Sequence, residues 1–289
     1  MHVVTLIAPP GGLPDSLIED LRARWTGGPL RWLAAREAAE FEVAAEPADL
    51  WAAWETCQGQ GVDLLLQPAV NRRKRMLLAD MDSTMIRQEC IDELAAVAGV
   101  GDRVAAITAR AMNGEIGFEG ALRERVGLLK DLPETVIVDV LRDRITYVPG
   151  GRELLATMKA QGAHAVLVSG GFLGFARPVA AHLGFHEARA NTLLARDGRL
   201  TGEVAEPILG REAKVAALEE VTARLGIGPQ DVLAVGDGAN DLGMLRLAGA
   251  GVALHAKPAV QAECRLRVNH GDLTALLYLQ GYARDDFAT

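Results

Sequence analysis

The sequence predicts an α/β protein built from two units: an N-terminal ferredoxin-like α+β domain at residues 1–71 and a doubly wound parallel-sheet domain at residues 72–289. Three observations predict this. Short apolar and amphipathic runs in the first unit follow the order strand–helix–strand–strand–helix–strand. In the second unit, short apolar runs alternate with helical stretches. The first of those runs is separated from the next by roughly 80 mostly helical residues, more than a crossover between parallel strands requires.

The first unit contains four expected strands and two expected helices. Strands are expected at 2–8, 30–36, 40–44 and 62–67, and helices at 14–25 and 47–57. A basic run at 72–75 follows. Four charges at a domain junction favour a solvated linker over the alternative, a nucleic-acid patch.

The second unit contains four short apolar runs of the kind found in buried parallel strands. They lie at 76–79, 164–168, 232–235 and 251–254. The long interval after the first run predicts an inserted helical cap at about 88–147. A second insertion is expected at 191–204, because its Asp197-Gly198 pair between alternating segments is a strong hairpin signal.

Composition and charge narrow the classes of partner and location. The formal net charge of −8 gives no bulk attraction to nucleic acid or anionic lipid, so neither is expected as a partner. The three cysteines show neither a disulfide framework nor metal-ligand spacing, which fits a reducing compartment. A signal peptide and a membrane span are both unexpected, so the predicted location is cytoplasmic.

Three polar clusters follow predicted parallel strands. They occupy 80–84, 169–171 and 236–241. Ligands of open parallel sheets bind beyond the carboxyl ends of the strands, so the three clusters are expected to converge on one site. Each motif alone is common turn chemistry. Their joint placement is what indicates function.

The residue types in these clusters suit phosphoryl transfer. Of two carboxylates at one strand end, Asp80 and Asp82, one can attack phosphorus and the other can move a proton. Oxygens of Asp80 and Asp237 can hold a hard cation such as Mg²⁺, which would offset their repulsion of phosphate. The Ser169 hydroxyl and the backbone N–H groups of its glycines can bind phosphate oxygens.

Two cations lie on apolar helix faces. Lys214 shares the apolar face of a helix at 211–225, where it either snorkels to solvent or neutralises phosphate. Arg125 lies in the apolar stripe of a helix at 118–130 and needs an anionic partner. That partner is either a carboxylate of the chain or a carboxylate of the substrate. Glu89 is either an ordinary first-turn glutamate or the partner of a substrate amine.

These motifs resemble the haloacid dehalogenase superfamily and, within it, the phosphoserine phosphatases. The local matches are at 89–93, 118–126 and 129–133, and the resemblance spans about residues 75–279. The first 70 residues resemble, more loosely, the ACT-like extension of bacterial members. One departure is Met81, where phenylalanine is commoner.

The resemblance implies a phosphoserine phosphatase that hydrolyses O-phosphoserine with Mg²⁺ in the last step of serine biosynthesis. Asp80 would be the nucleophile and a metal ligand, and Asp82 the general acid/base and a ligand through its backbone carbonyl. The other implied roles are metal binding by Asp237 and Asp241, phosphate binding by Ser169, Gly170, Lys214 and Asn240, and contact with the rest of the substrate by Glu89, Met112, Phe118 and Arg125.

Alternative functions remain open at this point. A phosphatase or phosphotransferase for another small phosphomonoester would keep the acids and Lys214 without needing Arg125. An amino-acid sensor built on the N-terminal domain is a hypothesis of a different class. The oligomeric state is also open, with a homodimer among the alternatives.

Overall fold

The N-terminal unit is an antiparallel sheet with two helices. The computed structural model describes residues 1–288. Its first elements are β1 (His2–Ile7), α1 (Asp15–Arg24), β2 (Arg31–Ala34), β3 (Ala38–Val43), α2 (Leu50–Gly59) and β4 (Asp63–Pro68). The strand order β2-β3-β1-β4, with every neighbouring pair antiparallel, is that of the predicted ferredoxin-like fold. Side chains such as Ile18, Phe41 and Leu64 form its own buried core.

The larger unit is built on a six-stranded parallel sheet of order β12-β11-β10-β5-β6-β7. Its strands are β5 (Met76–Ala79), β6 (His164–Phe172), β7 (Glu187–Asn191), β10 (Val232–Gly236), β11 (Ala250–Leu254) and β12 (Leu266–Val268). Its helices are α7 (Gly151–Ala160), α8 (Leu173–Leu183), α9 (Arg211–Leu225), α10 (Leu242–Leu247), α11 (Pro258–Glu263) and α12 (Ala275–Leu279). Short 3₁₀ helices lie at Pro229–Asp231 and Arg284–Asp286. The doubly wound fold is confirmed.

Strands β7 and β12 were not predicted from the sequence, because they lack the apolar run of a central strand. β7 carries Glu187 and Arg189 and is mostly half-buried, as an edge strand can be. β12, at the other edge, has only three residues. The neighbouring central strands β5 and β10 are buried throughout and were predicted within one residue.

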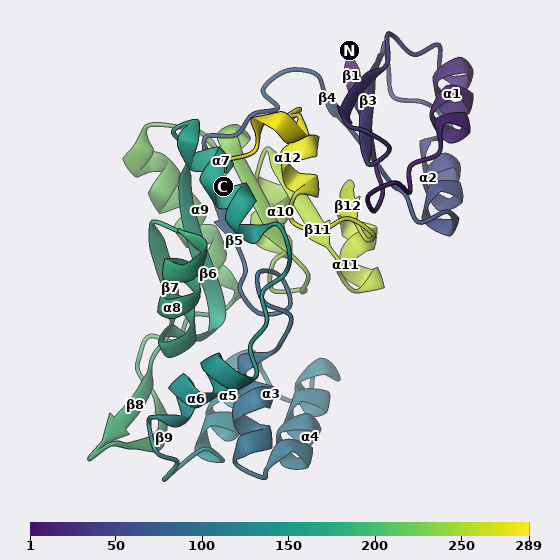
Figure 1. The fold of residues 1–289 in the computed structure, drawn as a ribbon. Helices are drawn as coiled ribbons and strands as arrows, with labels where there is room; N and C mark the ends of the chain where they lie inside the picture. The colour runs from purple at the N-terminus through teal and green to yellow at the C-terminus, as the bar shows by residue number, and fades with distance from the viewer. Residues whose placement is uncertain (289) are drawn as a thin grey trace.

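The cap consists of four helices inserted between β5 and β6, within the interval predicted for it. They are α3 (Cys90–Val97), α4 (Gly101–Met112), α5 (Phe118–Gly127) and α6 (Val136–Asp143). The helix predicted to reach residue 130 ends at Gly127. Figure 1 shows the cap at one end of the core, with the N-terminal unit at the other end.

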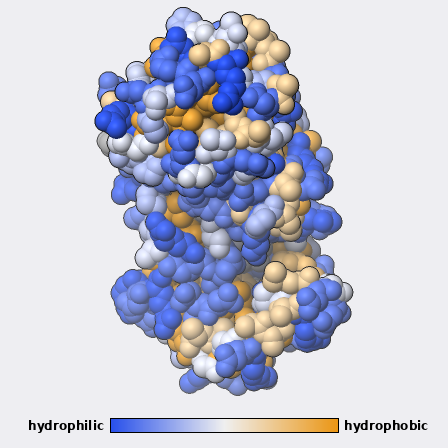
Figure 2. Space-filling model, turned by 90° about the vertical axis from the view of Figure 1, so that its right-hand side faces the viewer, coloured by the Kyte–Doolittle hydropathy of each residue, from blue (hydrophilic) through white to orange (hydrophobic). Residues whose placement is uncertain are grey.

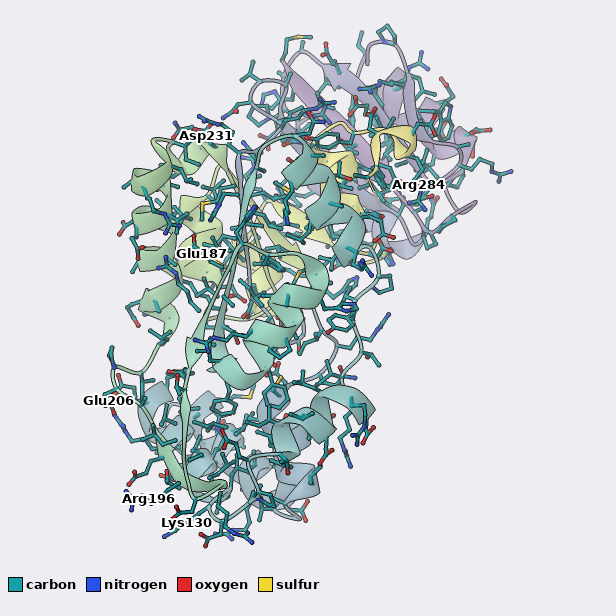
Figure 3. All side chains as sticks on the ribbon, turned by 60° about the vertical axis from the view of Figure 1, so that its left-hand side comes forward. Lys130, Glu187, Arg196, Glu206, Asp231 and Arg284 are labelled. Atoms are coloured by element: carbon teal, nitrogen blue, oxygen red, sulfur yellow. The ribbon has the colours of Figure 1, made fainter. Side chains whose placement is uncertain are left out.

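A hairpin completes the cap end of the molecule. Strands β8 (Leu193–Arg196) and β9 (Arg199–Val204) join through Asp197 and Gly198, whose φ angles of 52° and 73° are those of the predicted tight turn. The hairpin pairs with the cap through the Leu200 carbonyl, which accepts the Asp131 N–H at 2.9 Å. Lys130 and Arg196 accordingly lie together at this end in Figure 3, far from Asp231.

Two adjacent segments, 80–89 and 144–150, connect the cap to the core and are named the hinge segments. The Arg87 N–H donates to the Thr146 carbonyl at 2.9 Å, and the Val148 N–H donates to the Met85 carbonyl at 3.0 Å. Both segments lie beside the carboxyl end of β5, so the connection between cap and core is next to the acid cluster.

The prediction of a solvated linker at 72–75 fits Arg73 and Arg75, which are exposed, but is wrong for Arg72 and Lys74. Lys74 is 8% exposed, and its Nζ donates to the carbonyls of Asn71 and Gln230 at 2.6 and 2.8 Å. Arg72 is paired with Glu40 of β3, with an N–O distance of 2.5 Å. Arg72 and Lys74 find acceptors in both units, so these two residues form part of the contact between the units.

Asp63, the first residue of β4, also ties the two units together. Its fully buried carboxylate accepts backbone N–H groups of Asn269 at 2.8 Å, His270 at 3.0 Å and Gly271 at 2.8 Å. Three such donors compensate a carboxylate for its lost hydration. The loop after β12 is therefore fixed by a side chain of the N-terminal unit.

Hydrophilic residues cover most of the face drawn in Figure 2, with hydrophobic residues in smaller groups. Across the described part of the chain, 1–288, no helix combines the length and the apolar character needed to cross a bilayer.

Candidate active site

The acid pair lies at the carboxyl end of β5, where the chain leaves the sheet. Asp80 is 5% exposed and Asp82 is 9% exposed. The Asp80 N–H donates to the Val235 carbonyl of β10, and its Oδ1 accepts the Met81 N–H at 2.8 Å. The side chain of Met81, between the two acids, is buried in the hydrophobic core.

Lys214 of α9 reaches the same point. Its Nζ lies 2.8 Å from Asp80 Oδ2 and 2.5 Å from Asp241 Oδ1, and the side chain is 1% exposed. Burial lowers the pKa of Lys214, but the two carboxylates outweigh burial and raise it to about 12. The alternative in which Lys214 snorkels to solvent is therefore wrong.

Three carboxylates form a candidate metal centre. One oxygen from each of Asp80, Asp237 and Asp241 lies within 4.8 Å of the others. Burial and the Asp80 charge raise the pKa of Asp237 to about 6 and also raise that of Asp241. Clustered hard oxygen ligands that repel one another fit a divalent metal ion. The carboxylate of Asp82 is outside this cluster.

Supporting hydrogen bonds orient the acids. Thr84 donates its hydroxyl to Asp237 Oδ1 at 2.9 Å, and Asp241 Oδ2 accepts the N–H groups of Asp237 and Gly238 at 3.1 and 2.9 Å. Asp241 is fully buried between these donors and Lys214. Thr84 was not among the predicted site residues, although it belongs to the first polar cluster.

Asp82 occupies a different environment from Asp80. Its Oδ1 accepts the Cys90 N–H at 3.0 Å, and its Oδ2 accepts the Ser169 hydroxyl at 3.1 Å. Burial first, and then the nearby charges of Glu89 and Asp80, raise the pKa of Asp82 to about 7. Such a carboxyl can both release and accept a proton near neutral pH.

The second polar cluster lies in an irregular part of β6. The β6–β7 register shifts between Val168 and Phe172, and this frees the backbone of 169–171 from regular pairing. The Ser169 hydroxyl accepts the Gly171 N–H at 2.8 Å. A Cβ at Gly171 would lie 2.6 Å from Asp82 Oδ2, so the close approach of backbone and acid requires glycine.

Asn191, at the end of β7, connects this cluster to the segment that precedes α9. Its carboxamide N–H groups donate to the carbonyls of Gly170 at 2.8 Å and Leu209 at 3.1 Å, while its oxygen accepts the Leu209 N–H at 2.7 Å. The residue is 2% exposed. Sequence analysis placed Asn191 only at the start of the hairpin, because its partners are 18 and 21 residues away.

Glu89 and Arg125 belong to the cap, at the N-terminus of α3 and within α5. Glu89 Oε1 accepts the Ser83 hydroxyl at 2.7 Å. Arg125 donates to the Ala121 carbonyl at 3.2 Å and makes a long contact of 3.5 Å with Thr108, but it has no carboxylate partner within 4 Å among residues 1–288. The charge of Glu89 contributes to the raised pKa of Asp82, and it opposes the lowering of the Arg125 pKa by burial.

The remaining predicted residues are less enclosed. The Phe118 ring lies against the second cluster, within 3.4 Å of the position of a Cβ on Gly170, although the residue is 41% exposed. Asn240 is half-buried and packs on Gly238. Met112, at the end of α4, is 71% exposed, so the structure does not bring it into the acid cluster.

A family model for haloacid dehalogenase-like hydrolases matches residues 77–246, a segment that contains every acid of the cluster and Lys214. The chain belongs to this hydrolase family. A solved structure of a family hydrolase from Salmonella enterica serovar Typhi covers 98% of each chain with a TM-score of 0.88 and 30% identity. The family and the fold of the larger domain are therefore as the motifs predicted.

Curated relatives of this hydrolase carry a more specific name. A probable phosphoserine phosphatase of Schizosaccharomyces pombe is 40% identical over 92% of this chain and 89% of its own length. A phosphoserine phosphatase of Archaeoglobus fulgidus is 45% identical over 70% of this chain, which spans 59% of that protein. A substrate-bound phosphoserine phosphatase structure is 40% identical over 71% of this chain and 98% of its own, with a TM-score of 0.66.

Proposed function

We propose that this hydrolase is a phosphoserine phosphatase, converting O-phospho-L-serine to L-serine and phosphate in the last step of serine biosynthesis. The names of its relatives support the reaction, and the acid cluster supports the chemistry. The choice of substrate depends on one observation in this chain, the unpaired guanidinium of Arg125.

Arg125 is half-buried in the cap yet has no anionic partner among residues 1–288. Burial lowers its pKa, while the charges of Asp92 and Glu89 act in the opposite direction from beyond ion-pair distance. A half-buried guanidinium without an anionic partner can bind a substrate carboxylate by donating two hydrogen bonds. The Glu89 carboxylate can accept a hydrogen bond from the substrate ammonium. Carboxylate, ammonium and phosphate are the three charged groups of phosphoserine.

We propose Mg²⁺ as the metal, bound by carboxylates of Asp80, Asp237 and Asp241 and by the backbone carbonyl of Asp82. Three acids with oxygen donors suit this ion, which prefers oxygen ligands and retains several waters. When bound, it would supply positive charge that offsets repulsion between the acids and the phosphate.

In the proposed mechanism, a carboxylate oxygen of Asp80 attacks phosphorus, and the bond from phosphorus to the serine oxygen breaks. Asp82 donates its proton to that departing oxygen. Water then attacks phosphorus of the aspartyl-phosphate and transfers a proton to Asp82, which releases phosphate and restores both acids. Lys214, Ser169, the Gly170 backbone and Asn240 would hold the phosphate oxygens, while Met112 and Phe118 would line the cap side.

We also propose a cytoplasmic location and a division into domains at residues 1–71 and 72–289. The three thiols, Cys57, Cys90 and Cys264, are free and buried, which fits a reducing compartment. The N-terminal unit has a hydrophobic core of its own, which fits a separate domain.

The substrate is tested by measuring phosphate release from O-phospho-L-serine with Mg²⁺ beside phosphothreonine, sugar phosphates and a nucleotide. We expect the highest kcat/KM with phosphoserine. A higher kcat/KM with a substrate that lacks the amino-acid group would contradict the substrate assignment while leaving the phosphatase chemistry intact.

A further inference from the structure

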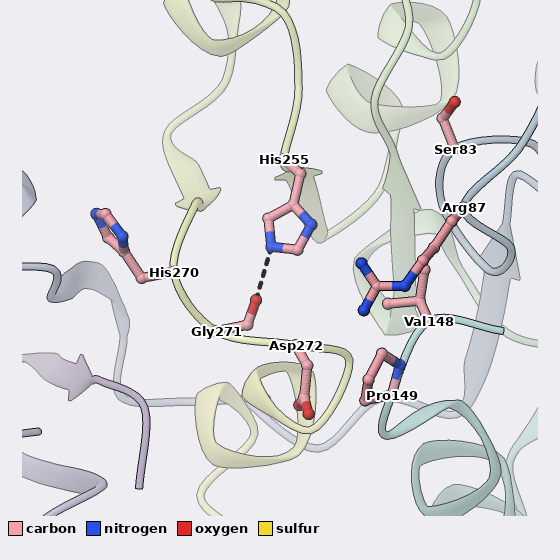
Figure 4. A pocket seen from close by; sticks show the side chains of 8 residues that line it. All are labelled: Ser83, Arg87, Val148, Pro149, His255, His270, Gly271 and Asp272. Atoms are coloured by element: carbon pink, nitrogen blue, oxygen red, sulfur yellow. Dashed lines mark hydrogen bonds between the residues drawn. The ribbon is translucent and has the colours of Figure 1, made fainter. Parts of the chain in front are cut away.

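A polar pocket lies beside the segments that connect the cap to the core, and its lining includes none of the four acids of the candidate active site. Its volume is about 360 Å³. Both hinge segments contribute to it through Ser83, Arg87 and Val148, and the core contributes His255 and the loop carrying Gly271 and Asp272 (Figure 4). The pocket therefore spans the boundary between the cap connection and the core.

The guanidinium of Arg87 lines this pocket without a hydrogen-bonding or ion-pair partner among residues 1–288. Its side chain is exposed, and its guanidinium makes no hydrogen bond or ion pair with any residue of the described chain, 1–288. The carboxylate in the lining, Asp272, is already engaged: its Oδ1 accepts the Thr274 N–H at 2.8 Å and hydroxyl at 2.6 Å. In Figure 4 that carboxylate points away from Arg87, so the guanidinium is free for an external anion.

His255 supplies a second polar group with a defined role. Its Nε2 lies 2.8 Å from the Gly271 carbonyl oxygen, which can only accept, so Nε2 carries the proton. In the neutral ring, Nδ1 is then a hydrogen-bond acceptor, and Figure 4 shows this nitrogen on the side of the ring toward Arg87. The pocket thus presents a guanidinium donor and an imidazole acceptor together.

We propose that this pocket is a second phosphate site, which binds inorganic phosphate as the hydrogen phosphate dianion. Two unprotonated oxygens accept from the Arg87 guanidinium, a bidentate arrangement that suits this side chain. The protonated oxygen donates to His255 Nδ1. Sulfate matches phosphate in size and charge but has no proton to donate at neutral pH, so the site discriminates between these two anions.

Occupancy of this site is coupled to the active site through Ser83. Ser83 lines the pocket, has a left-handed φ of 55°, and donates its hydroxyl to Glu89 Oε1 at 2.7 Å. Phosphate between Arg87 and His255 would link the first hinge segment to the core and restrain cap movement. This consequence depends on the proposed function, in which phosphate is a product and Glu89 holds the substrate amine; the binding itself does not.

Binding is tested by calorimetric titration of phosphate into the full chain whose active site is filled with Mg²⁺ and beryllium fluoride, a mimic of the aspartyl-phosphate. We expect one saturable site and weaker binding of sulfate at equal ionic strength. Arg87→Ala should weaken phosphate binding by about tenfold or more, since it removes a charge-assisted contact. Arg177→Ala, which removes an exposed charge on α8 outside the lining, should bind as the wild type does.

A kinetic measurement gives an independent check. Phosphate acting at the active site alone competes with the substrate, whereas phosphate in the hinge pocket adds a noncompetitive component. We expect that component in the wild type and its loss in Arg87→Ala, with uninhibited kcat/KM unchanged. The proposal is overturned if the blocked wild-type chain shows no saturable phosphate binding, if sulfate binds equally well, or if Arg87→Ala binds as tightly as the wild type.

Discussion

The Nζ of Lys214 lies 2.8 Å from Oδ2 of Asp80, and both side chains are almost fully buried. The proposed nucleophile is therefore held by a cation from a helix 134 positions later in the chain (214 − 80 = 134). The same ammonium contacts Asp241 of the acid cluster. Lys214 thus orients two acids, and its positive charge partly offsets the negative charge that an incoming phosphate would meet.

Replacing this lysine is expected to disable the site. Lys214→Met retains most of the side-chain volume but leaves Asp80 and Asp241 without their cation. We expect kcat/KM for phosphoserine to fall by about 10²–10³-fold, the usual loss when a preorganised electrostatic contact is removed. Lys130→Met, at an exposed lysine between cap helices α5 and α6, is the matched control and should retain wild-type activity. Comparable activity of the two variants would contradict the assigned role.

Arg125→Ala tests the carboxylate contact. We expect kcat/KM for phosphoserine to fall by about 30–100-fold, because a charge-assisted bidentate pair is lost. Activity on p-nitrophenyl phosphate, which lacks a carboxylate, should remain within about twofold of the wild type. Arg123→Ala removes a neighbouring arginine that pairs on the surface with Glu119 and Glu206, and should affect neither substrate. Equal losses on both substrates would show that Arg125 is structural.

Asn191→Ala tests the link between the second cluster and the start of α9. The change leaves the part-buried Leu209 N–H and Gly170 carbonyl without their partner, so we expect the free energy of unfolding to fall by about 1–3 kcal/mol. As a positioning residue, Asn191 should also alter KM for phosphoserine and Ki for phosphate in parallel. Thr192→Ala, at the exposed neighbouring position, is the control for both measurements. A stability loss without any change in KM or Ki would leave Asn191 with a structural role only.

The ionisation of Glu187 is expected to make the free energy of unfolding depend on pH. Partial burial raises its pKa, but hydrogen bonds from His164, Arg189 and Arg224 outweigh this and lower it to about 2. Because the pKa falls on folding, the ionised form stabilises the fold above the unfolded pKa of 4.5, and this stabilisation disappears as pH falls toward about 2. Figure 3 places Glu187 on the flank of the core, away from the cap end marked by Lys130.

The corresponding measurement compares urea unfolding of Glu187→Gln and the wild type across pH. We expect the variant to be less stable by a constant amount from pH 7 to about 5, with the difference shrinking below pH 4.5. Glu219→Gln, an exposed glutamate on α9, should show no such difference. A difference that stays constant throughout the acid range would contradict the lowered pKa.

Asp63→Asn tests the contact between the two units. The amide keeps one acceptor oxygen but turns an NH₂ group toward backbone N–H donors, so we expect a loss of about 2–4 kcal/mol in the free energy of unfolding. Asp20→Asn, on the exposed face of α1, is the control. Faster hydrogen exchange at 269–271 in the variant would locate the change at the interface, and unchanged exchange there would exclude it.

The sequence by itself determined the fold class and the chemical core of the site. Central parallel strands are buried on both faces, so β5 and β10 appear as apolar runs that end in acids. Parallel strands bring their carboxyl ends to one edge, which is why Asp80, Ser169 and Asp237 could be grouped before any contact was known. The Asp197-Gly198 turn was also a local signal, whereas the cap was predicted from the length of the interval between two strands.

Only the tertiary structure decided between alternatives that share one local pattern. A lysine on an apolar helix face has the same spacing whether it snorkels or pairs, and the acids that Lys214 meets come from other strands. The edge strand β7, the links made by Asn191 and Asp63, and the free guanidinium of Arg87 likewise depend on groups distant in sequence. Periodicity reports which face of an element is buried; the partner that meets that face is set by packing of the whole chain.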